Sequence, residues 1–123
     1  MSTPLDPAAY VATVVTLYVE LPDTPLRASV SDQWLARRLY DDGVPLHVVE
    51  TALLLGSLRR LIRPAEAPRL SPIRSLAYFR PVIDELQDHP APESYLDYLR
   101  LRLRQTAAAL PASVQKPTFS DDR

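Results

Sequence analysis

Proline restricts how this chain can fold more than any other residue, because it occurs 13 times in 123 residues while glycine occurs 2 times. Proline lacks a backbone N–H donor, so it suits the first turn of a helix and disrupts a helix interior or a central strand. Several prolines follow residues that cap helices, as in Asp6-Pro7 and Ser71-Pro72. This placement predicts helices joined by short, stiff loops.

Five segments between these prolines have helical character. The segment 7–21 is rich in valine, which favours strands, but its length and its Asp-Pro start favour a helix. A second helix is expected from Ser31 to Gly43, because glycine suits the position after a helix end. Further helices are expected at 45–63, 71–87 and 93–110. The inward residues of the second helix are expected to be Trp34, Leu35, Leu39 and Tyr40.

The third and fourth helices carry most of the predicted core. The segment 45–63 is apolar around nearly its whole circumference, which is typical of a helix in the middle of a bundle. Gly56 indicates either a closely packed neighbour or a permissive site, since glycine costs about 1 kcal/mol against alanine inside a helix. In the segment 71–87, Pro81 should kink the helix or split it. The apolar face of this segment consists of Leu76, Phe79, Ile83 and Leu86.

These elements predict an all-α fold, a single compact bundle of about five helices with proline-rich short loops. We expect one helical domain over residues 1–110 and a flexible C-terminal tail at 111–123.

The composition excludes several classes of protein. The absence of cysteine excludes a disulfide scaffold, a thiol nucleophile and a cysteine zinc site. Two glycines cannot build a glycine-rich phosphate loop, and His47 with Glu50 is only a weak metal-ligand spacing. No stretch approaches the roughly 20 apolar residues of a membrane span, and the first residues show no secretory signal. We therefore expect no enzyme, no metal, no cofactor and no membrane segment, and a cytoplasmic location.

Charge is unevenly distributed although its sum is only −1. Residues 59–80 carry a net charge of +5, whereas residues 1–58 carry −4 and residues 81–123 carry −2. The basic window contains no lysine, and arginine is the side chain that binds phosphate through two parallel hydrogen bonds. The candidate nucleic-acid-binding residues are Arg59, Arg60, Arg63, Arg69, Arg74 and Arg80, with Tyr78 as a possible base-stacking residue.

The sequence also offers a structural explanation of the same arginines. Arg59, Arg60 and Arg63 stand at the predicted end of a helix, where cations interact favourably with the helix dipole. The other arginines can pair with acidic residues of the N-terminal half. In that case, the chain is a protein–protein adaptor or an oligomerisation module, with a partner surface on outward leucine and tyrosine residues of the last helix.

One stretch resembles a known family. Residues 34–53 and the later segment 73–82 are similar in order to the C-terminal helical domain of DnaD-like replication-initiation proteins. That family has a Tyr-x-x-x-Ile-x-x-x-Trp pattern, and Tyr78, Val82 and Leu86 fall at its spacings, with leucine in place of tryptophan. The resemblance implies a non-catalytic module that binds DNA and a replication protein, in replication or in a mobile element.

Overall fold

The computed structural model describes residues 6–108, which form five α-helices and one short 3₁₀ turn. The described residues contain no strand, so the all-α prediction is confirmed. The predicted domain end at 110 and the predicted tail at 111–123 lie outside the described residues. In chain order the elements are α1 (Pro7–Val19), α2 (Val30–Asp41), α3 (Leu46–Leu61), η1 (Leu76–Phe79), α4 (Arg80–Asp88) and α5 (Ser94–Ala108).

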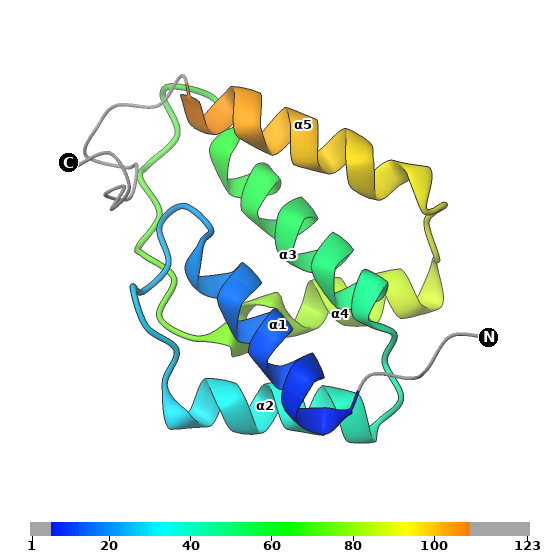
Figure 1. Ribbon diagram of the computed structural model, residues 1–123. Coiled ribbons are helices and arrows are strands. Elements are labelled where there is room, and N and C mark those ends of the chain that lie inside the picture. Colours follow the sequence, from blue (N-terminus) through cyan, green and yellow to red (C-terminus); the bar gives the residue numbers. More distant parts are fainter. Residues whose placement is uncertain (1–5, 109–123) are drawn as a thin grey trace, which may run out of the picture.

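Helix α3 lies in the middle of the bundle, as its apolar circumference predicts (Figure 1). It packs against α5 along one side and against α1, α4 and η1 along the others. Helix α2 contacts only α1 and η1 closely, so it is an outer helix with a broad exposed face. The residues of α3 that are buried are Val49, Thr51, Ala52, Leu53, Leu55, Gly56, Ser57 and Leu58.

The predicted start of the first helix and the predicted end of the second are confirmed by their capping geometry, whereas α1 ends at Val19 rather than at residue 21 and α2 begins at Val30 rather than at Ser31. The Asp6 carboxylate accepts a hydrogen bond from the N–H of Ala9 at 2.7 Å, and proline occupies the first turn of α1. After α2, Gly43 adopts a φ of +79°, a left-handed conformation that glycine tolerates best. The N–H of Gly43 donates to the carbonyl of Tyr40, and the N–H of Val44 donates to the carbonyl of Leu39. These two bonds end the helix.

The predicted helix at 71–87 is wrong in its first part. Residues 71–75 are not helical, because this stretch runs beside the loop after α1, where the N–H of Ile73 donates to the carbonyl of Asp23 at 2.9 Å. Ser75, not Ser71, caps the turn that follows. Pro81 splits the remainder, since it lies in the first turn of α4, where its missing N–H needs no partner. The predicted apolar face is confirmed, because Leu76, Phe79, Ile83 and Leu86 are all buried.

The prediction that Trp34 faces inward is also wrong, because its side chain is 70% exposed. The inward face of α2 consists of Asp32, Ala36 and Leu39. Successive helical residues are about 100° apart, so Trp34 points away from Asp32. Leu39 is buried as predicted, whereas Leu35 and Tyr40 are only half-buried.

Asp32 is a buried carboxylate that holds two elements together. One oxygen accepts from the N–H of Ser29 at 2.9 Å, while the Ser29 hydroxyl accepts from the N–H of Asp32 at 3.0 Å. This reciprocal pair is a capping box at the start of α2. The other oxygen accepts from the N–H of Leu76 at 2.9 Å, 44 residues away in the chain. Asp32 therefore fixes η1 against the N-terminus of α2.

Gly56 is explained by close packing, the first of the two alternatives. A Cβ at this position would lie 2.8 Å from Cδ1 and 3.0 Å from Cε1 of Phe79. Phe79 is fully buried and also packs edge-on against Tyr18. The glycine therefore lets the η1 aromatic ring lie directly on the central helix.

We expect Asp32→Asn to lower the free energy of unfolding by about 2 kcal/mol, because the neutral amide keeps only one of the two acceptor oxygens. Asp32→Ala should lower it by about 4 kcal/mol, because it leaves both the buried N–H of Leu76 and the part-buried N–H of Ser29 without this partner. Urea denaturation measures both. The control is Asp41→Asn, which removes an exposed ion pair with Arg37 and should change stability by less than about 0.5 kcal/mol. Equal effects of Asp32→Asn and Asp41→Asn would contradict the role of Asp32.

We expect Gly56→Ala to destabilise the fold by about 1 to 3 kcal/mol, because the new methyl group displaces the Phe79 ring and this outweighs the gain in helix propensity. The double variant Gly56→Ala with Phe79→Leu is the control, since the smaller side chain gives the methyl group room. Denaturation should show that the two substitutions together cost less than the sum of their separate effects. Strict additivity would sink this explanation of Gly56.

Candidate functional site

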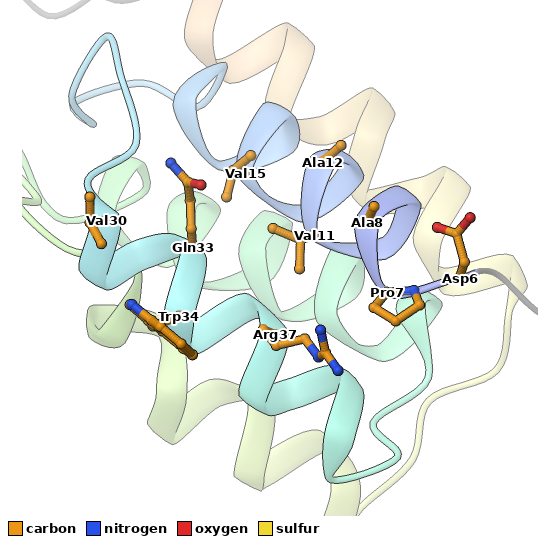
Figure 2. Close-up of a pocket in the computed structure, with 10 residues that line it drawn as sticks. All are labelled: Asp6, Pro7, Ala8, Val11, Ala12, Val15, Val30, Gln33, Trp34 and Arg37. Carbon is orange, nitrogen blue, oxygen red and sulfur yellow. The ribbon is translucent and has the colours of Figure 1, made fainter.

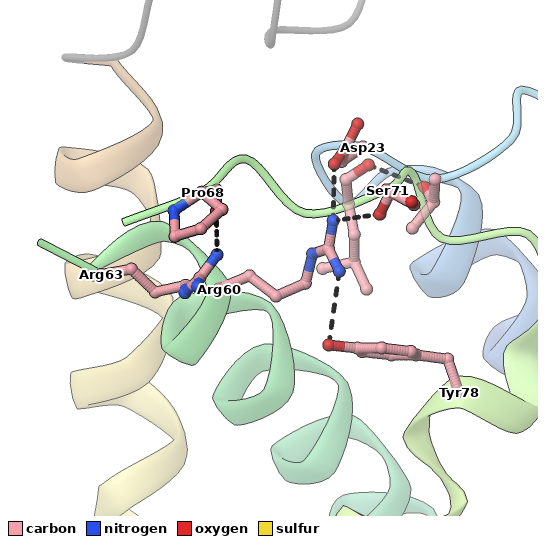
Figure 3. Close-up of polar contacts among 8 residues, drawn as sticks. Asp23, Arg60, Arg63, Pro68, Ser71 and Tyr78 are labelled. Atoms are coloured by element: carbon pink, nitrogen blue, oxygen red, sulfur yellow. Dashed lines mark hydrogen bonds and ion pairs between the residues drawn. The ribbon is translucent and has the colours of Figure 1, made fainter. Parts of the chain in front are cut away.

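Arg60 is a structural residue rather than a free cation. Its side chain is 8% exposed and forms an ion pair of 2.7 Å with Asp23, which lies 20% exposed in the loop after α1. The same guanidinium donates to the carbonyl of Ser71 at 2.8 Å and lies 5.3 Å from the ring centroid of Tyr78 (Figure 3). Arg60 thus ties the end of α3 to two loops, and one face of the Tyr78 ring is covered by this cation.

Two further arginines of the window are paired with carboxylates of α4. Arg59 binds Glu85 through two parallel hydrogen bonds of 2.8 and 2.7 Å. These bonds lower the pKa of Glu85 below its ordinary value. Arg80 lies 3.5 Å from Asp84 in a looser ion pair one helical turn along α4.

The remaining arginines have no carboxylate partner among residues 6–108. Arg63 donates to the carbonyl of Pro68 at 2.7 Å, which orders the guanidinium but leaves its charge uncompensated. Arg69 and Arg74 are exposed. Arg63 and Arg69 line one hollow of about 210 Å³ together with Arg60, whereas Arg74 is not among the residues that line it. The structure therefore brings three of the six predicted residues together.

Tyr78 is 44% exposed, so it is accessible at the surface as its predicted stacking role requires. Its ring packs edge-on against Phe79 at 5.1 Å between centroids, and its hydroxyl is 3.4 Å from Arg60. Base stacking by Tyr78 and nucleic-acid binding through all six arginines stay predictions. Three of those cations already have carboxylate partners.

A second site, which the sequence analysis missed, is an apolar groove of about 900 Å³ between α1 and α2 (Figure 2). Its α1 wall contains Val11 and Val15, and its α2 wall contains Val30 and Trp34. Val30 and Trp34 are each 70% exposed. Sequence reasoning missed the groove because it placed Trp34 in the core.

The groove continues past Trp34 into a basic hollow of about 490 Å³. This hollow is lined by Arg37 and Arg38 of α2 and by Arg80 at the start of α4, with Asp41 as its one lining carboxylate. The ion pair between Arg38 and Asp42 is long, at 3.9 Å. Trp34 therefore stands between an apolar groove and a hollow lined by three arginines, whose exposed ion pairs with Asp41, Asp42 and Asp84 measure 3.0, 3.9 and 3.5 Å.

His47 and Glu50, which have a weak metal-ligand spacing in the sequence, have other surroundings in the structure. Glu50 accepts hydrogen bonds from Arg100 of α5, the shorter at 2.6 Å, while His47 is exposed. Within residues 6–108 we find no group of three or more histidines and carboxylates placed to hold a metal ion. None of the helices in that range has the length and apolar character needed to cross a membrane.

Comparison of the chain with protein-family models, curated proteins and solved structures gives no match. The resemblance to DnaD-like proteins therefore stays a prediction, and the candidate sites rest on their own geometry.

Any binding of duplex DNA by the arginines of residues 59–80 should involve about three phosphates, because only Arg63, Arg69 and Arg74 are free of carboxylates within the described chain. The logarithm of the affinity should then fall with the logarithm of the salt concentration with a slope of about −2.7. Fluorescence anisotropy with a labelled duplex measures this slope. A slope near about −5.4 would show that all six arginines contact phosphate.

Proposed function

We propose that the chain is a protein-binding module whose α1–α2 groove takes an amphipathic helix with acidic side chains. The observation that carries this proposal is Trp34, a large aromatic side chain that is 70% exposed beside an apolar groove. Tryptophan and arginine are the residues in which binding energy concentrates at protein interfaces. Here one tryptophan is flanked by arginines on an outer helix.

The dimensions of the groove suit a helix. Its walls run from Pro7 to Val15 on α1 and from Val30 to Arg37 on α2. At 1.5 Å per residue these walls are about 10 to 12 Å long, or about two helical turns. A partner helix placed there packs on α1 and α2 as a third helix packs on a helical pair. Its apolar residues, spaced three or four positions apart over two turns, face the groove.

The charge beside Trp34 favours an acidic partner. Three arginines and one carboxylate line the adjoining hollow. Each arginine is ion-paired within its own helix, Arg37 with Asp41 at 3.0 Å, Arg38 with Asp42 at 3.9 Å and Arg80 with Asp84 at 3.5 Å. All three pairs are solvent-exposed, so they contribute little stability. Acidic side chains of a partner can replace these contacts at small cost, which supports an amphipathic helix with Asp or Glu over a basic one.

Trp34 is the single tryptophan of the chain, so its fluorescence reports on the groove directly. We expect helical peptides selected from a random display library to carry apolar residues at helical spacing together with Asp or Glu. Binding should shift Trp34 emission to shorter wavelength. Trp34→Ala, followed by the anisotropy of a labelled peptide because this variant has no tryptophan, should weaken binding by about 30-fold, the loss typical of a central interface tryptophan.

The matched control is Tyr98→Ala, which removes an aromatic side chain that is 51% exposed on α5, away from the groove. It should leave peptide binding unchanged. Selected peptides that bind equally well to Trp34→Ala, or basic peptides that bind as tightly as acidic ones, would overturn the proposal. A dimer in light scattering that Trp34→Ala dissociates would identify a second copy of the chain as the occupant instead.

A further inference from the structure

We infer that the hollow between the end of α3 and the following loop binds a phosphate group. It is lined by Arg60, Arg63 and Arg69, with Asp23 as its one lining carboxylate, and lies apart from the groove beside Trp34. The inference does not depend on the proposed function, because no residue lines both the hollow and that groove.

The positions of the cations are fixed before any ligand arrives. The ion pair with Asp23 and the bond to Ser71 hold the nearly buried Arg60 in place. Arg63 is held over the loop by its 2.7 Å bond to the carbonyl of Pro68 (Figure 3). The loop itself is turned by a bond from the N–H of Ala67 to the carbonyl of Pro64. Such preorganisation reduces the entropy lost when an anion binds.

The charge balance of the hollow matches a phosphate. Asp23 is matched by Arg60, so the charges of Arg63 and Arg69 are left without a carboxylate among the lining residues. Two positive charges complement a phosphate group, whose charge at neutral pH is close to −2. A single carboxylate would satisfy only one of them.

Hydrogen-bond donors and space are also sufficient. Arginine carries five N–H donors, and Arg63 donates one of them to Pro68. Arg69 is exposed and makes no hydrogen bond to another residue of 6–108 that would compete with a ligand. The hollow of about 210 Å³ has room for a phosphate group together with part of the group that carries it. The hollow therefore accepts a phosphomonoester as well as inorganic phosphate.

The test is titration of the ¹⁵N-labelled chain with inorganic phosphate, phosphoserine and a nucleoside monophosphate, each followed by NMR. We expect saturable shifts at the amides of Leu61, Ala67 and Leu70, which line the hollow, and none with chloride at equal ionic strength. Arg69→Gln should weaken binding by about tenfold, the effect of losing a charged hydrogen bond.

Arg74→Gln is the control, because it removes the same charge from an exposed arginine that does not line the hollow. It should change the affinity less than twofold. Equal losses in the two variants, or shifts that never saturate, would overturn the inference. The ligand that binds most tightly then identifies the group attached to the phosphate. If the phosphates bind and the acidic peptides do not, the proposed function of the α1–α2 groove is rejected and the phosphate site stands.

Discussion

The buried carboxylate of Asp32 is the interaction on which the rest of this bundle depends. It places a negative charge at the N-terminus of α2, where the helix dipole and the N–H of Ser29 stabilise it, and it also accepts from Leu76. The two bonds join α2 to η1 although η1 has only four residues and little stability of its own. Burial raises the pKa of the neighbouring Tyr18 hydroxyl, and the charge of Asp32 adds to this effect.

The position of η1 then determines the packing of the core. With Leu76 fixed by Asp32, Phe79 comes to lie on Gly56 of the central helix. The orientation of α2 follows from the same bond, because an inward Asp32 places Trp34 on the opposite side of the helix. One polar contact therefore sets both the core packing and the exposure of the aromatic residue that lies at the groove.

The helices were predictable from the sequence, and the side chains that form the sites were predictable only in part. Local signals such as Asp6-Pro7 and Gly43 predict helix ends correctly, because caps act within a few residues. The misplaced start at Ser71 has a tertiary cause, since the bond from Ile73 to Asp23 joins positions 50 residues apart. Trp34 was misplaced because hydrophobicity alone suggests burial, whereas the position of a buried aspartate decides the helix orientation.

The arginine window shows how charge segregated along a sequence is partly balanced in space. Arg60 pairs with Asp23 from the acidic segment before it, and Arg59 pairs with Glu85 from the acidic segment after it. These pairs could not be assigned from the sequence, because each joins residues more than 25 positions apart.

The loop that holds Arg63 and Arg69 brings these two cations to one hollow, whereas Glu66 of the same loop is exposed and does not line it. Like charges in one hollow repel one another and oppose folding of the loop, unless an anion relieves the repulsion. The bond from Arg63 to Pro68 contributes only a neutral acceptor, so it fixes the position of the charge without compensating it. The same reasoning applies to Trp34, whose exposure leaves apolar surface in water. Each feature is unfavourable in the isolated chain and becomes favourable when an anion or an amphipathic helix binds, and for this reason the two proposals start from this hollow and from Trp34.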